Sequence, residues 1–158
     1  MKMKLFDKRI TKEILGFIIK DFSALGYIPF HLILTIFLLI LDFFLFTKYA
    51  LTMALTYAFL FILRASFYMK RPKKTRKYKT LLGKVDYNSR FSAHTATSFS
   101  LAIVIGLSTT VPILIYLLIF ATFIGLSRIY LKQHYIINVI NGAIVGVLIG
   151  LLVNLVIF

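Results

Sequence analysis

The chain contains no cysteine and no tryptophan among its 158 residues, and acidic residues are scarce. Without cysteine it can form no disulfide, no thiolate nucleophile and no cysteine-ligated zinc or iron–sulfur site. Five Asp and Glu residues stand against 19 Lys and Arg residues, so the formal net charge is +14 and an anionic partner is expected. With 60% hydrophobic residues and a mean hydropathy of +0.92, the composition excludes an ordinary soluble domain and a disordered chain.

Long apolar runs dominate the rest of the sequence. A helix needs about 20 mostly apolar residues to cross a bilayer, and five runs reach that length or can be extended to it. The runs are 28–46, 49–69, 92–107, 110–126 and 135–158. The sequence therefore predicts a single all-α domain over residues 1–158, a polytopic transmembrane bundle of about five spans.

An amphipathic segment precedes the first run. Apolar residues recur there at helical spacing with lysines between them, namely Ile10, Ile14, Phe17 and Ile18. This pattern predicts a helix that lies in the membrane interface. A cleaved signal peptide is the competing interpretation, and it is disfavoured because a lysine and an aspartate interrupt the apolar stretch.

The last apolar run carries glycines at a spacing of four residues, at Gly142, Gly146 and Gly150. A stripe of small residues along a helix lets the backbone of another helix come close. The stripe predicts close helix packing and indicates no chemistry.

The basic residues gather on one side of the predicted bundle. If the five spans alternate in direction, the N-terminal segment, the 70–90 loop and the 128–134 connection leave the membrane on one side, here named face A. Face A then carries 18 of the 19 cations, and Lys48 alone lies on the other side. The basic run within 70–79 is expected to attract anionic headgroups. Nucleic acid is disfavoured as a partner because Tyr78 is the one aromatic residue inside that run.

Polar residues at the span ends of face A are typical of an anion site. Arg64 and Arg71 are seven residues apart and are expected to share one face of a helix. Pro72 would end that helix. Ser92, a candidate N-cap, and His94 open the third span, where free backbone amides favour an anion.

The fourth and fifth spans add to this group. Ser127 and Arg128 close the fourth span, while His134 and Asn138 lie one turn apart at the entry to the fifth. Three arginines, two histidines and a hydroxyl can bind a tetrahedral oxyanion, because the planar guanidinium pairs with two oxygens at once. One histidine could act as nucleophile and the other as acid and then base. Paired carboxylates are absent at these positions, so no metal is expected.

These residues resemble the three signature blocks of the type 2 phosphatidic acid phosphatase (PAP2) superfamily. The blocks read Lys, six residues, Arg-Pro; then Pro-Ser-Gly-His; then Ser-Arg, five residues, His, three residues, Asp. The first resembles Arg64 with Arg71-Pro72, with Arg for Lys. The second resembles Phe-Ser-Ala-His at 91–94, which lacks the Pro and Gly. The third resembles Ser127-Arg128, His134 and Asn138, with Asn for Asp.

The resemblance implies a metal-independent phosphatase without a cofactor. His134 would attack phosphorus and form a phosphohistidine, and His94 would protonate the leaving oxygen. The phosphate would be held by Arg64, Arg71, Ser92 and Arg128.

Asn138 stands where the family has the aspartate that accepts a hydrogen bond from the nucleophilic histidine. The resemblance therefore implies that Asn138 accepts this bond without supplying charge. A slower enzyme is expected, or a substitute carboxylate, for which Asp86 is the candidate. His31 belongs to no block and is left unassigned.

A site at the bilayer surface favours a lipid phosphate as substrate. The resemblance implies lipid A 1-phosphate or phosphatidylglycerophosphate, with an isoprenyl diphosphate as the alternative. A rival interpretation is a non-catalytic binder or transporter of anionic lipids, and haloperoxidase chemistry is a distant third. The expected partners are a phosphorylated lipid and anionic headgroups, with no nucleic acid and no obligate protein partner.

Two arguments on orientation conflict. The positive-inside rule would put face A in the cytoplasm. Bacterial members of the family imply the inner membrane with the active site on its outer, periplasmic face, and we expect the latter.

Overall fold

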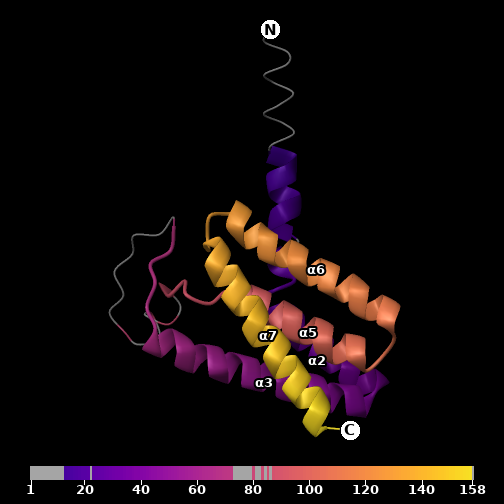
Figure 1. The fold of residues 1–158 in the computed structure, drawn as a ribbon. Coiled ribbons are helices and arrows are strands. Elements are labelled where there is room, and N and C mark those ends of the chain that lie inside the picture. Colours follow the sequence, from indigo (N-terminus) through magenta and orange to yellow (C-terminus); the bar gives the residue numbers. More distant parts are fainter. Residues whose placement is uncertain are drawn as a thin grey trace.

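The computed structural model describes residues 13–21, 23–72, 80, 83, 85 and 87–157. The bundle is built from five helices (Figure 1): α2 (Ile28–Leu41), α3 (Phe43–Ser66), α5 (Ala93–Leu107), α6 (Val111–Tyr130) and α7 (Ile136–Val156). Helix α5 is the central element, since it packs against α3, α6 and α7. The predicted all-α class is confirmed, because the described part of the chain holds helices and no strand.

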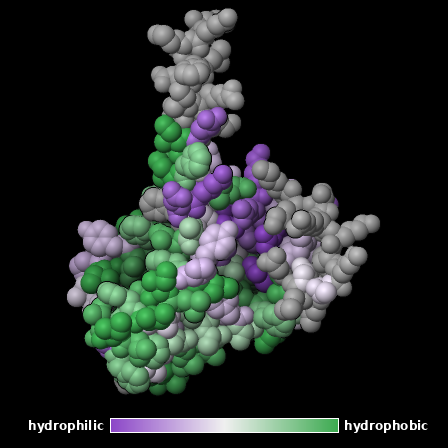
Figure 2. Space-filling view, turned by 180° about the vertical axis from the view of Figure 1, so that it is seen from behind, coloured by the Kyte–Doolittle hydropathy of each residue, from purple (hydrophilic) through white to green (hydrophobic). Residues whose placement is uncertain are grey.

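The surface of the bundle is apolar, as a membrane protein requires. Helices α3, α6 and α7 are long and apolar enough to cross a membrane, whereas α2 and α5 are shorter, with 14 and 15 residues. Large side chains such as Ile33 and Ile40 are more than half exposed. Figure 2 shows hydrophobic residues covering the body of the bundle and hydrophilic ones gathered at its end beside the N-terminal helix. Such apolar area on the outside of a protein is stable against lipid and not against water.

The boundary between the first two helices differs from the predicted one. The runs 28–46 and 49–69 predicted a break near Lys48, but α2 ends at Leu41 and α3 begins at Phe43. Asp42 causes the break: its backbone is extended, and its carboxylate accepts hydrogen bonds from the backbone N–H of Phe44 and Leu45 at 2.9 and 3.0 Å. An N-cap aspartate satisfies amides that a new helix leaves unpaired. The other three helices begin and end within four residues of the predicted runs, apart from residue 158, which is not described.

The glycine stripe of α7 packs closely on α5, as predicted. A Cβ atom on Gly142 would lie 2.5 Å from the carbonyl oxygen of Ser92, and one on Gly146 would lie 2.2 Å from that of Ala96. At the same end of the two helices, the backbone N–H of Ser92 donates to the carbonyl of Asn138 at 3.0 Å. The start of α5 and the start of α7 are therefore held side by side.

The segment before α2 is helical over residues 13–21 and projects away from the bundle (Figure 1). Its apolar residues Ile14, Phe17 and Ile18 are all exposed, which fits the predicted amphipathic helix. Ile10, which was part of that prediction, lies outside the described residues.

Replacing Gly146 with alanine is expected to destabilise the bundle, because the added methyl group cannot fit against the carbonyl of Ala96 without moving α7 away from α5. The free energy of unfolding in detergent should fall by about 1–3 kcal/mol. Gly16→Ala is the matched control, since a Cβ atom there meets nothing within 4 Å. Equal stability of the two variants would contradict the close packing.

Candidate functional site

A cavity of about 650 Å³ opens where the C-terminal ends of α3 and α6 meet the N-terminal ends of α5 and α7. Five of the seven predicted site residues line it, and they come from four segments of the chain: Arg64, Arg71, His94, Arg128 and His134. The other two, Ser92 and Asn138, are fully buried and do not line the cavity. The structure thus brings the three sequence blocks together at one end of the bundle.

Arg71 lines the cavity, but it lies in an extended segment and not in the predicted continuation of the helix. Helix α3 ends at Ser66, six residues before Pro72, so Arg71 does not share a helix face with Arg64. The cause is the buried side chain of Asn88, whose amide donates to the carbonyl of Arg64 at 2.6 Å and also to that of Phe67. These bonds replace those of the next helical turn, and the chain leaves α3 in an extended form.

The side-chain carbonyl oxygen of Asn88, Oδ1, completes this junction. It accepts from the backbone N–H of Met69 at 3.0 Å and from that of Arg90 at 2.9 Å. A single side chain therefore joins the end of α3 to the segment that leads into α5. Sequence patterns give no sign of this role, since Asn88 belongs to none of the three blocks.

Arg64 is buried and joins α3 to α5. Its Nε and one terminal nitrogen donate to the carbonyl oxygen of Phe91 at 3.0 and 2.5 Å. Phe91 directly precedes Ser92, whose hydroxyl accepts from the hydroxyl of Thr95 at 2.8 Å and from its backbone N–H at 3.4 Å. Ser92 is thus the N-cap of α5, as predicted.

His134 is held in one tautomer by a backbone carbonyl. Its Nδ1 lies 3.1 Å from the carbonyl oxygen of Ser89, so Nδ1 carries the proton and Nε2 keeps its lone pair. Burial, and then the positive charge of Arg71, lower the pKa of His134 to about 3, against the opposing effect of the Ser89 bond. The imidazole is therefore neutral at physiological pH, which is the state a nucleophile needs.

Asn138 does not occupy the position that the resemblance implied. Its amide nitrogen donates to the hydroxyl of Ser89 at 2.8 Å, and its Oδ1 is buried without a partner. The acceptor that orients His134 is the Ser89 carbonyl, so Asn138 contacts the residue that holds His134. Asp86, the substitute carboxylate considered above, lies outside the described residues.

His94 lies at the start of α5 under the segment that precedes α2. Its ring meets the ring of Tyr27 edge-on, with centroids 4.3 Å apart. A side chain on Gly26 would strike the imidazole, since a Cβ there would lie 2.7 Å from that of His94. The Nε2 atom of His94 is buried and has no hydrogen-bond partner, which leaves it available to a bound group.

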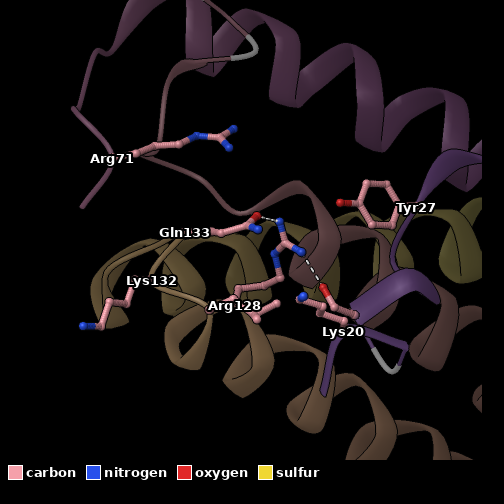
Figure 3. A pocket seen from close by; sticks show the side chains of 8 residues that line it. Lys20, Tyr27, Arg71, Arg128, Lys132 and Gln133 are labelled. Atoms are coloured by element: carbon pink, nitrogen blue, oxygen red, sulfur yellow. Dashed lines mark hydrogen bonds between the residues drawn. The ribbon is translucent and has the colours of Figure 1, made fainter. Parts of the chain in front are cut away.

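Arg128 is buried at the end of α6 and held from two sides, as Figure 3 shows. Its terminal nitrogens donate to the hydroxyl of Ser23 and to the side-chain carbonyl of Gln133. The guanidinium also lies 5.9 Å from the centre of the Tyr27 ring. Its backbone carbonyl accepts from the N–H groups of Gln133 and His134 at 3.0 and 3.3 Å, which ties this arginine to the histidine.

Sequence reasoning missed Ser23, Tyr27, Asn88, Ser89 and Gln133. The one signal for Gln133 is its position directly before His134, and none exists for the others. His31, left unassigned, is buried and its Nδ1 lies 2.6 Å from the hydroxyl of Tyr49 on α3. Among the described residues, no three His, Asp or Glu side chains lie close enough together to hold a metal ion.

Comparisons with known proteins bear on this site. The model of the PAP2 superfamily matches residues 45–158. The crystal structure of LpxE from Aquifex aeolicus is similar to this chain, with a TM-score of 0.77 and 26% sequence identity, over 89% of this chain and 86% of that one. No match is found among curated proteins. The family match includes all seven predicted site residues, and it begins after the segment that contributes Ser23 and Tyr27.

Proposed function

Because the chain belongs to the PAP2 superfamily, we propose that it hydrolyses a phosphorylated membrane lipid by way of a phosphohistidine. The family and the likeness to LpxE make it a lipid phosphatase in the membrane. The proposal adds the substrate, lipid A 1-phosphate or phosphatidylglycerophosphate, and assigns the activity to one domain over residues 1–158.

One observation carries the mechanism: a neutral, oriented His134 lines the same cavity as His94 and three arginines. Nε2 of His134 attacks phosphorus, and the bond from phosphorus to the lipid oxygen breaks. His94 in its protonated form gives its proton to that leaving oxygen. His94 then takes a proton from water, the resulting hydroxide attacks the phosphohistidine, and inorganic phosphate leaves with His134 restored.

The arginines stabilise the transition state in this proposal. Arg64, Arg71 and Arg128 would pair with the equatorial phosphate oxygens, on which negative charge spreads as the bond breaks. The backbone amides at the start of α5, which Ser92 caps, would add to this. Bound phosphate would also provide the anion beside which His94 can gain its proton. No step in this scheme uses a metal ion.

Two other functions are tested against this one. The first is hydrolysis of an isoprenyl diphosphate, which would use the same groups on a different lipid. The second is non-catalytic binding of anionic lipids, for which the arginines suffice and His134 is dispensable.

Hydrolysis should be tested with purified protein in detergent, supplied with each of these lipids in the presence of a chelator. We expect phosphate release that persists with chelator and falls by about a thousandfold or more in His134→Ala, because removing a nucleophile leaves little beyond binding. His31→Asn is the matched control: it removes a histidine that does not line the cavity, and an amide can keep the Tyr49 bond. Lipid binding without release in the parent protein would favour the non-catalytic binder.

Substituting Asn138 with aspartate tests how His134 is oriented. Where a carboxylate bonds the catalytic histidine directly, exchange with an amide changes kcat by about four orders of magnitude. Here the carbonyl of Ser89 already holds Nδ1, and the hydroxyl of Ser89 can turn to donate to the new carboxylate. We therefore expect kcat of Asn138→Asp to stay within about tenfold of the parent. A rise of several orders of magnitude would mean that the missing charge limits turnover.

We propose that the protein lies in the inner membrane with the cavity on the periplasmic side, where it meets anionic headgroups. Because the chain lacks cysteine, Lys70→Cys creates a unique, exposed thiol at the cavity end of the bundle. An impermeant maleimide should label it in intact spheroplasts. Thr109→Cys, exposed between α5 and α6 at the other end, is the matched control and should be labelled only after lysis. The reverse pattern would place the cavity in the cytoplasm.

A further inference from the structure

A second cavity of about 480 Å³, whose lining Figure 3 draws, shares part of its lining residues with the first. The shared residues are Tyr27, Arg71, Arg128 and Gln133. His94 and His134 line only the larger cavity. A group bound in the smaller cavity would therefore lie beside the proposed point of hydrolysis without contacting the two histidines.

The smaller cavity is strongly basic. Four of its lining residues are cations, and the described residues that line it include no acid: Lys20, Arg71, Arg128 and Lys132. In Figure 3, the guanidinium groups of Arg71 and Arg128 and the hydroxyl of Tyr27 face a common space, while Lys132 points away from it. Hydrogen-bond donors and positive charges that converge on one space are a site for an anion.

Arg128 lies on the wall that the two cavities share, so its charge attracts an anion in either cavity. Its side chain is 3% exposed, its Nε is buried without a hydrogen-bond partner, and the groups that hold its terminal nitrogens, Ser23 and Gln133, are both neutral. A buried charge with neutral partners alone is costly. A bound anion would remove that cost.

The smaller cavity is built in part by residues outside the family match. Lys20, Ser23 and Tyr27 precede residue 45, where that match begins. Lys20 and Ser23 come from the N-terminal segment, and the hydroxyl of Ser23 accepts a hydrogen bond from Arg128 of α6. The larger cavity, by contrast, is lined by residues of the three sequence blocks. The smaller cavity can therefore set a preference of this chain without changing the proposed catalytic residues.

We infer that the smaller cavity binds a second phosphate of the same substrate headgroup, with Lys20 as a specificity-determining residue. This rests on the proposed function and narrows its substrate class to lipids whose headgroup carries two phosphates close together. Of the two proposed substrates, phosphatidylglycerophosphate has that feature. Isoprenyl diphosphates, the substrates of the alternative function, have it as well. Lipid A 1-phosphate has no second phosphate beside the one removed.

The test compares matched lipid pairs, each with two phosphates or one: phosphatidylglycerophosphate with phosphatidic acid, and farnesyl diphosphate with farnesyl phosphate. The readout is the ratio of kcat/KM within a pair. In the pair whose two phosphates are spaced to reach both cavities, Lys20→Glu should lower the ratio by about tenfold. A loss of that size is expected when one charge-assisted hydrogen bond is removed. Lys20→Arg should restore it. Lys70→Glu is the matched control, because Lys70 is exposed at the same end of the bundle and does not line the cavity.

An unchanged ratio in Lys20→Glu for both pairs, or an equal fall in Lys70→Glu, would overturn the inference. Free phosphate is the other source of the same anion. If 10-fold molar excess of inorganic phosphate raises turnover of the one-phosphate lipids to the two-phosphate rate, with Lys20 required, the cavity binds free phosphate and the inference is again overturned.

Failure of the proposed function is separable from failure of this inference. Equilibrium binding of the same lipid pairs to the His134→Ala protein needs no turnover. The second site would be supported if His134→Ala bound the two-phosphate lipid more tightly and the double variant His134→Ala/Lys20→Glu did not. This result would hold even if the parent protein released no phosphate. Equal affinity for both lipids of each pair would count against the site whatever the turnover.

Discussion

The geometry of the site depends on how the segment 88–92 connects three helices. The side chain of Asn88 replaces the helical hydrogen bonds at the end of α3. The next residue, Ser89, holds His134 through its carbonyl and Asn138 through its hydroxyl. Ser92 then begins α5 and donates its N–H to α7. Buried backbone groups must find partners in a bilayer as in any protein core, so these bonds fix the positions of the histidines and arginines together.

A second constraint is electrostatic. Arg64 and Arg128 are buried: Arg64 donates to the carbonyl oxygen of Phe91, and Arg128 donates to the hydroxyl of Ser23 and the side-chain carbonyl of Gln133. Positive charge held this way disfavours protonation of His134, which stays neutral, and it favours a doubly charged phosphate. The same positive charge therefore favours both reactants of the proposed displacement, the neutral imidazole of His134 and the doubly charged phosphate. Burying these positive charges destabilises the empty protein, and binding an anion would relieve that unfavourable free energy.

The glycine stripe and the segment before α2 both position residues of the site through close contacts with the start of α5. Gly142 lets the backbones of α5 and α7 meet at Ser92. In the segment before α2, Gly26 and Tyr27 pack directly against His94. Lys20 lines the smaller cavity and Arg71 lines both, whereas the two histidines line the larger cavity alone. The position of the N-terminal segment thus allows it to influence selection although it lies before the family match.

The sequence by itself determined the helical class, the approximate spans and the gathering of charged residues at one end. Each of these follows from local hydropathy and from the position of a polar residue at the end of an apolar run. Close packing along Gly142 and Gly146 was likewise evident from spacing alone, because the spacing of four residues puts both on one helix face.

The tertiary structure alone decided which groups contact one another inside the site. Arg71 leaves the helix because Asn88, 17 residues later in the chain, takes over the bonds of α3. Ser89 rather than Asn138 orients His134, and Ser23 meets Arg128 from 105 residues away. Contacts of this kind depend on the path of loops and on the packing of distant helices, for which spacing within one segment carries no information.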